Sequence, residues 1–156
     1  MKKDNINLTI LLCLLLSFCS GFASCGDDEE KVLDPCLPFE VALEKADAVY
    51  TDAYTLYGIT NMRGELLAVN KEGKIQFLIR YRHQNGSETY YCPVNLPDSF
   101  LLEFFMLESY HVIGEVPCDI GFITFSGEIK PLLEGMEYDP VVLTYAKISP
   151  LCNLDN

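Results

Sequence analysis

The sequence contains no tryptophan, only two histidines and no apolar run long enough to cross a membrane as a helix. The apolar stretch near its start, Leu8–Phe18, falls short of the roughly 20 residues that a membrane-spanning helix needs. The hydrolase motif G-x-S-x-G, the metalloprotease motif H-E-x-x-H and a phosphate-binding loop are also missing. The sequence therefore gives no sign of a helical membrane protein or of these enzyme classes.

The few side chains with catalytic chemistry do not form a recognisable set. We expect His83 to face solvent beside a hairpin turn and His111 to pack at the end of an apolar segment. Ser126 has no evident partner that would activate it. The many acidic residues supply so many carboxylate pairs that no glycosidase pair stands out. We therefore predict that the chain is not an enzyme and has no metal site or cofactor, with a small hydrolase as the less favoured alternative.

The charge of the chain is strongly one-sided. It has 23 acidic and 11 basic residues, which give a net charge of −12. Such a surface repels phosphate backbones, so we expect no nucleic-acid partner. Hydrophobic residues make up 49% of the chain, and nine Tyr and nine Phe can furnish a core without tryptophan. A chain of 156 residues with this composition is typical of one globular domain.

The start of the chain has the parts of an exported leader. Lys2 and Lys3 give it a positive end, Leu8–Phe18 forms an apolar centre, and small residues follow. We predict that residues 1–24 are a signal peptide, with a buried N-terminal helix as the alternative.

The residues that follow resemble a lipoprotein signal. Phe22-Ala23-Ser24-Cys25 is similar to a bacterial lipobox, which implies that the Cys25 thiol receives a diacylglyceryl group and that the leader is cut before it. Several acyl chains, at about 0.8 kcal/mol for each buried CH₂, would hold the chain to the membrane permanently. The next residues resemble the acidic export signal of Bacteroidetes-type lipoproteins: Gly26, Asp27, Asp28, Glu29 and Glu30.

This export signal implies a lipid-anchored protein of the outer membrane that faces the cell exterior, with the inner leaflet as the alternative. Without the resemblance, an acidic run of this kind is typical of a solvated linker. We predict a flexible acidic linker over residues 25–38 and a single β-rich domain over residues 39–156.

The remaining cysteines are an even set in a chain expected to enter an oxidising compartment: Cys36, Cys92, Cys118 and Cys152. We predict disulfides rather than a metal site, because no pair has the close spacing of a zinc knuckle. Four cysteines allow three pairings, and the sequence does not choose among them. A Cys92–Cys118 bridge would contribute about 3 kcal/mol. Cys36 and Cys152 lie near the two ends of the domain, where a bridge would tie them together.

Three strands are predicted in the first half of the domain. Lys74–Arg82 alternates apolar and polar residues, which is typical of a strand with one buried face, and only Leu78 interrupts its polar face. Arg63–Val69 precedes it across a glycine-containing turn. Ser87–Val94 follows an Asn-Gly pair, a strong hairpin signal. The three segments predict an antiparallel meander.

The second half predicts one short helix and two more strands. Residues 100–107 fit a helix that plugs one end of the sheet, or else a buried strand. Phe122–Lys130 and Val141–Ile148 fit strands, with Gly127 at a tight bend or close backbone approach. The order of elements is typical of an all-β fold of the OB type, a five-stranded barrel. The alternative is a small β-sandwich in which Val49–Ile59 adds a strand.

Two segments resemble a known group of proteins. The stretches CPVNLPDSF and ITFSGEIKP, within residues 90–150, are similar to small surface lipoproteins of Bacteroidetes, among them the NigD-like proteins. The resemblance implies a β-barrel or sandwich at the cell surface and brings no catalytic residue with it.

These observations favour a non-catalytic binding or accessory module of the cell envelope. Exposed tyrosines are one candidate platform for a glycan or protein ligand, although core positions are the favoured interpretation for them. The candidates are Tyr50, Tyr54, Tyr57, Tyr90 and Tyr91. The alternative function is an inhibitor or protective factor whose acidic surface masks a basic secreted protein.

Overall fold

The computed structural model describes residues 34, 36–107 and 113–152. The predicted lipidation site Cys25, the export signal Gly26–Glu30 and His111 lie outside these described residues. Within the described part the regular structure is mostly β, as the sequence predicts. No helix there has the length and apolarity required to cross a bilayer.

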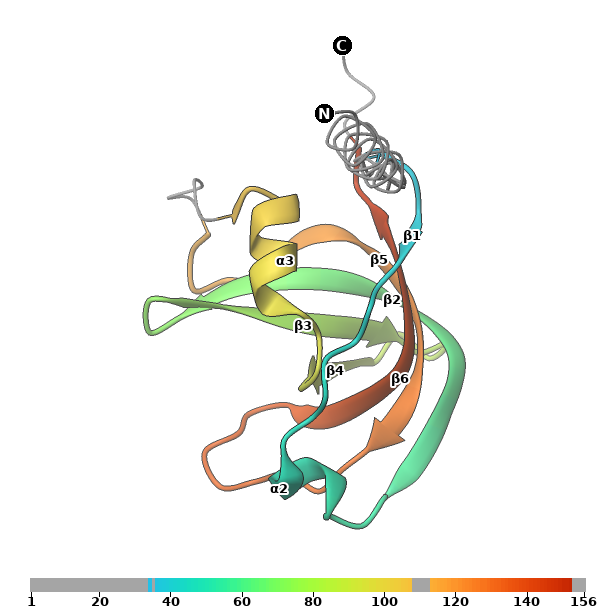
Figure 1. The fold of residues 1–156 in the computed structure, drawn as a ribbon. Coiled ribbons are helices and arrows are strands. Elements are labelled where there is room, and N and C mark those ends of the chain that lie inside the picture. Colours follow the sequence, from blue (N-terminus) through green and yellow to red (C-terminus); the bar gives the residue numbers. More distant parts are fainter. Residues whose placement is uncertain (1–33, 35, 108–112, 153–156) are drawn as a thin grey trace, which may run out of the picture. The chain divides into compact units, whose positions relative to one another are not determined.

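Six strands and two short helices make up the described part of the chain (Figure 1). The helices are α2 (Ala48–Thr51) and α3 (Asp98–Phe104). The strands are β1 (Phe39–Glu40), β2 (Tyr57–Lys71), β3 (Lys74–Arg82), β4 (Glu88–Pro93), β5 (Cys118–Ile129) and β6 (Asp139–Pro150).

Five of the strands close into a ring. β2, β3 and β4 form the predicted antiparallel meander, and β5 pairs with both β2 and β6. β6 then runs parallel to β4, so the ring order is β2-β3-β4-β6-β5. With α3 between β4 and β5, the ring has the element order predicted for an OB-type fold. The sandwich alternative is wrong, because all the strands belong to one sheet and residues 49–59 form α2, a loop and only the start of β2.

A sixth strand, which the sequence did not predict, adds to the ring. β1 pairs with the far end of β6, where Phe39 lies opposite Ile148. β4 covers only the first three residues of β6. Between these two pairings, the buried side chain of Asn95 takes the place of a strand: its amide donates to the Leu143 carbonyl at 2.9 Å and accepts from the Leu143 N–H at 2.8 Å.

The main core lies inside the ring and follows the alternation of the strands. Phe77 and Ile79 of β3 point inward and are buried, as their spacing predicts. Leu78 belongs instead to a small apolar cluster on the outer face. Met136 and Tyr138, from the loop that joins β5 to β6, pack against this cluster. Leu78, the one apolar residue on the polar face of β3, therefore belongs to a second layer of packing outside the ring.

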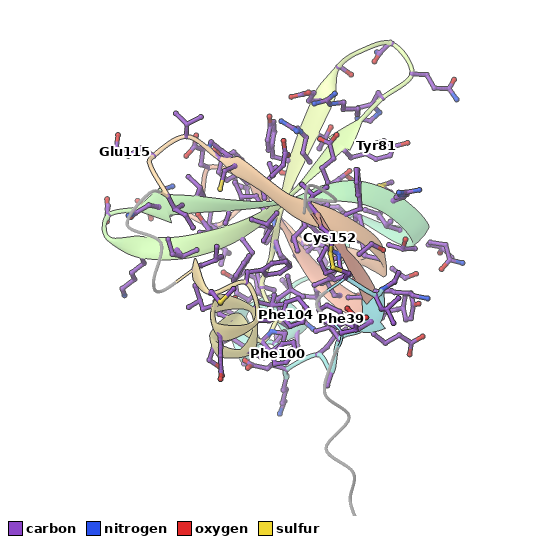
Figure 2. All side chains as sticks on the ribbon, turned by 90° about the horizontal axis from the view of Figure 1, so that it is seen from above. Phe39, Tyr81, Phe100, Phe104, Glu115 and Cys152 are labelled. Atoms are coloured by element: carbon purple, nitrogen blue, oxygen red, sulfur yellow. A yellow bond between two sulfur atoms is a disulfide. The ribbon has the colours of Figure 1, made fainter. Side chains whose placement is uncertain are left out.

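One end of the ring is covered by α3, as predicted. Leu101 is fully buried and Phe104 packs on Phe39 of β1, with ring centroids 4.6 Å apart. Phe100 approaches the same ring edge-on at 6.0 Å. Figure 2 shows these three aromatic rings gathered beside α3. The helix starts at Asp98 without a side-chain cap, so its position depends on this apolar contact.

Gly127 marks a bend in β5. The register between β5 and β6 shifts between Ser126 and Gly127, and a Cβ added at Gly127 would lie 2.5 Å from the Val142 carbonyl oxygen. The predicted close backbone approach at this glycine is confirmed.

Candidate functional site: an arginine face on the ring

All three arginines of the chain lie on one outer face of the ring. Arg63 comes from β2, whereas Arg80 and Arg82 come from β3. Each alternates with residues that point into the core, so all three side chains point outward. We call this surface the arginine face and define it by Arg63, Glu65, Arg80, Arg82, Glu88, Asp119 and Phe122.

The arginine face surrounds a shallow hollow of about 220 Å³. Its wall is formed by the three arginines with Glu65, the backbone of Gly64 and the ring of Phe122. Phe122 reaches the site because β5 pairs with β2, which sets it opposite Glu65. The hollow is open and smaller than a typical pocket for a drug-sized ligand, so it suits a single ring or a short side chain.

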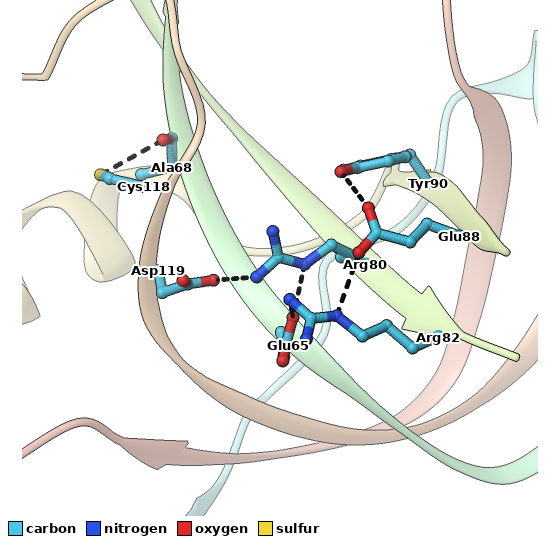
Figure 3. A network of polar contacts seen from close by, with 8 residues as sticks. All are labelled: Glu65, Ala68, Arg80, Arg82, Glu88, Tyr90, Cys118 and Asp119. Atoms are coloured by element: carbon cyan, nitrogen blue, oxygen red, sulfur yellow. Dashed lines mark hydrogen bonds and ion pairs between the residues drawn. The ribbon is translucent and has the colours of Figure 1, made fainter. Parts of the chain in front are cut away.

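Two of the arginines are held by carboxylates (Figure 3). Arg80 donates from Nε to Glu65 and from Nη2 to Asp119 at 2.7 Å. Arg82 pairs with Glu88 at 3.0 Å and with Glu65 at 3.5 Å. Burial by itself would lower the pKa of Arg80, but the hydrogen bond to Glu65 and the neighbouring negative charges raise it above its usual value. Arg80 therefore stays charged and fixed.

Arg63 is bound differently. Its guanidinium carbon lies over the Phe122 ring, 4.9 Å from the ring centroid, and its side chain is exposed. Among the described residues it forms no ion pair. A cation over an aromatic ring is attracted by the π face and does not use its N–H donors. Arg63 thus offers a planar fork of donors to a ligand.

The structure resolves the pairing of the cysteines. Cys36 and Cys152 form a disulfide, whereas Cys92 and Cys118 are not bonded. The suggested Cys92–Cys118 bridge is wrong. By way of β6, Cys92 lies opposite Pro140, which is next to the Ile129 end of β5, whereas Cys118 is at the opposite end of that strand. By the other way round the ring, β3 and β2 lie between β4 and β5. Three strand spacings amount to about 14 Å, beyond the reach of a disulfide. Cys92 instead accepts a hydrogen bond from Gln76.

The five candidate tyrosines do not form one platform. Tyr91 is buried in the core, and Tyr90 packs against Tyr138 in the outer cluster. Tyr50 donates a hydrogen bond to the sulfur of Met136. Tyr54 and Tyr57 are exposed at 69% and 47%.

The candidate catalytic side chains likewise remain apart. His83 is exposed and contacts Thr89 at 2.8 Å. Ser126 accepts a hydrogen bond from the Asn61 N–H. Among the described residues, no three or more His, Cys, Asp or Glu side chains are placed to hold a metal ion.

Sequence reasoning missed the arginine face. One signal was available: in an acidic chain, two of the three arginines occupy outward positions of the best-predicted strand, Lys74–Arg82. Their meeting with Arg63 and Phe122 depends on the pairing of β2 with both β3 and β5.

Comparisons with known proteins assign no family to the chain: no family model matches it, and no curated protein or solved structure matches it significantly.

Proposed function

We propose that this chain is a non-catalytic binding module of the cell envelope and that lipid on Cys25 anchors it in the outer membrane. In this proposal the domain presents its arginine face to a glycan. The observation that carries the proposal is the gathering of all three arginines and Phe122 around one hollow in a chain of net charge −12.

The chemistry of the arginine face supports a glycan ligand. Arginine side chains donate hydrogen bonds, and the carboxylates of Glu65, Glu88 and Asp119 accept them. Sugar hydroxyls both donate and accept, so they match such a mixed surface. The outer strand faces of OB-type folds bind oligonucleotides or oligosaccharides. This support for a glycan ligand is an analogy from the fold alone. The net charge of −12 disfavours an oligonucleotide ligand.

The segment between the predicted lipid on Cys25 and the disulfide at Cys36 sets how far the domain can reach from the membrane. Ten residues separate Cys25 from Cys36. Fully extended, a segment of this length spans at most about 35 Å. A lipid on Cys25 would therefore keep the domain close to the membrane and within reach of surface glycans.

Binding is tested with the full-length protein in detergent on an array of bacterial and host glycans. We expect wild type to bind a subset of glycans and the variant Arg63→Ala to bind them more weakly. Lys74→Ala is the matched control, because it removes one exposed positive charge six residues from Arg80 along β3, about 20 Å away. If no glycan binds wild type, or if both variants weaken binding equally, the proposal fails.

The anchor is tested by cell fractionation. Cys25→Ala should release the protein from the membrane pellet and raise its apparent mass, because the leader is no longer removed. Protease added to intact cells should digest wild type if the domain faces outward. A Cys25→Ala protein that still pelleted with membranes at the wild-type mass would refute lipid anchoring.

A further inference from the structure

We infer that the glycan carries a carboxylate and that Arg63 is the residue that binds it. This inference rests on the proposed function and makes it more specific: the ligand is an acidic sugar of the uronic-acid type, bound through one carboxylate at a time.

Arg63 is the candidate because the other two arginines already form ion pairs with carboxylates of the arginine face. Arg80 is held between Glu65 and Asp119, and its side chain is only 16% exposed. Arg82 bridges Glu65 and Glu88, and Tyr90 donates a further hydrogen bond to Glu88 at 2.8 Å. A ligand that captured either arginine would leave a carboxylate without its partner, which opposes binding.

Arg63 lacks this obstacle. It is exposed, forms no ion pair with any described residue, and rests over Phe122 at the wall of the hollow. The contact with the ring limits the positions of the guanidinium, so less freedom is lost when a ligand binds. An arginine fork matches the two oxygens of a carboxylate, and such charge-assisted pairs are stronger than neutral hydrogen bonds.

The neighbouring charges favour a monoanion on a sugar. Glu65, Glu88 and Asp119 balance the three arginines, so the arginine face is close to neutral, and a phosphate or polyanionic chain would meet these carboxylates. Hydroxyl groups next to the sugar carboxylate donate to such acceptors, and Asp119 is half exposed to receive them. A peptide carboxylate brings no comparable set of hydroxyls, so the mixed surface favours the sugar.

The test compares each acidic oligosaccharide with its methyl ester, which keeps the sugar ring and removes the negative charge. Trimers that contain one galacturonic, glucuronic or mannuronic acid unit and two neutral sugars are titrated into the full-length protein in detergent, and binding is measured by calorimetry. We expect at least one free acid to bind wild type about 10- to 100-fold more tightly than its ester, as for a charge-assisted pair.

Variants assign the effect to Arg63. Arg63→Gln should abolish the preference for the acid over the ester, whereas Arg63→Lys should keep part of it, because lysine retains the charge without the planar fork. Lys74→Gln, which removes a distant charge, should keep the full preference. The acid–ester comparison on wild type still decides the question of charge if a variant fails to fold.

The remaining outcomes separate the two proposals. Equal binding of acid and ester by wild type would overturn this inference and leave glycan binding intact. A blank glycan array together with no binding of any trimer would overturn both. Acetylated dipeptides with a free carboxyl terminus that bound as tightly as the sugar acids would overturn the choice of a sugar ligand.

Discussion

Gly127 shows how a single missing side chain shapes the ring. A Cβ at this position would meet the carbonyl oxygen of Val142 at 2.5 Å and the Cα of Leu143 at 3.1 Å. Both atoms belong to the backbone of β6, which cannot move aside as a flexible side chain can. The bend in β5 therefore requires glycine for space.

Gly127→Ala should lower the free energy of unfolding by about 1–3 kcal/mol, a usual cost of overpacking. Gly58→Ala is the control, because the nearest atom to its added Cβ lies 4.0 Å away. The control should change stability by less than about 0.5 kcal/mol. Urea unfolding of the two variants measures the difference, and equal effects would contradict the close-approach explanation.

Asn95 offers a second prediction at this scale. Asn95→Ala leaves the Leu143 N–H and C=O without their partner in the stretch of β6 between its pairings with β4 and with β1. We expect a loss of about 2–4 kcal/mol, because each unsatisfied buried group costs about 1–3 kcal/mol. Asn85→Ala removes an amide from an exposed turn and should cost clearly less. If chemical denaturation gave the same midpoint for both variants, Asn95 would not serve as a substitute strand.

At the scale of elements, local sequence patterns predicted the strands that pair with a strand close to them in sequence. The alternation in Lys74–Arg82 gave the bounds of β3, and the Asn-Gly pair placed the hairpin before β4. β2 is far longer than predicted, because its first half contains a register shift and Asn61 has φ of 48°, which interrupts the alternation. β1 has only two residues and exists because β6 offers them an edge.

A polar clasp joins the segment before β2 to the end of β5. Lys130 is buried, and its ammonium group donates to Thr55 at 2.9 Å and to the Ala53 carbonyl at 3.2 Å. It also pairs with Glu128 at 2.7 Å. Hydrogen bonds from Lys130 and then from Thr55 lower the pKa of Glu128.

This clasp predicts a pH dependence. Because the pKa of Glu128 is lower in the folded state, its contribution to stability is present above the unfolded pKa, near 4.5, and is lost as the pH falls through the folded pKa. Glu128→Gln should therefore show a smaller fall in stability between pH 7 and pH 3 than wild type. Glu134→Gln, which changes an exposed acid outside any ion pair of the described residues, should keep the wild-type fall. Parallel pH profiles for wild type and Glu128→Gln would contradict the prediction.

For the whole molecule, the disulfide joins two points near the ends of the domain. Cys36 and Cys152 are 116 residues apart in sequence. In the chain-entropy model, closing a loop of about this length stabilises the folded state by about 4–5 kcal/mol. The double variant Cys36→Ser/Cys152→Ser should therefore unfold at a much lower urea concentration. Cys118→Ser, which changes an unbonded exposed cysteine, should behave as wild type. Equal midpoints would show that the bridge adds nothing.

The arginine face also depends on the whole molecule, because its residues come from strands that are far apart in sequence. For this reason the sequence did not reveal it. Arg63 and Phe122 are far apart along the chain and meet only because β5 lies beside β2 in the ring and pairs with it. Arg80 and Asp119 meet for the same reason. Periodicity shows which way a side chain points from its strand, but it does not show which strand lies beside it.

The disulfide has a mechanical consequence. A pulling force applied to the chain ahead of Cys36 does not act on the two-residue β1 alone, because the bridge transmits it to Cys152 and hence to β6. β6 pairs along most of its length with β5 and also with β4. Tension is thus shared by β6, β5 and β4, so a pull on the chain ahead of Cys36 has to break the ring before it unravels the end of the domain.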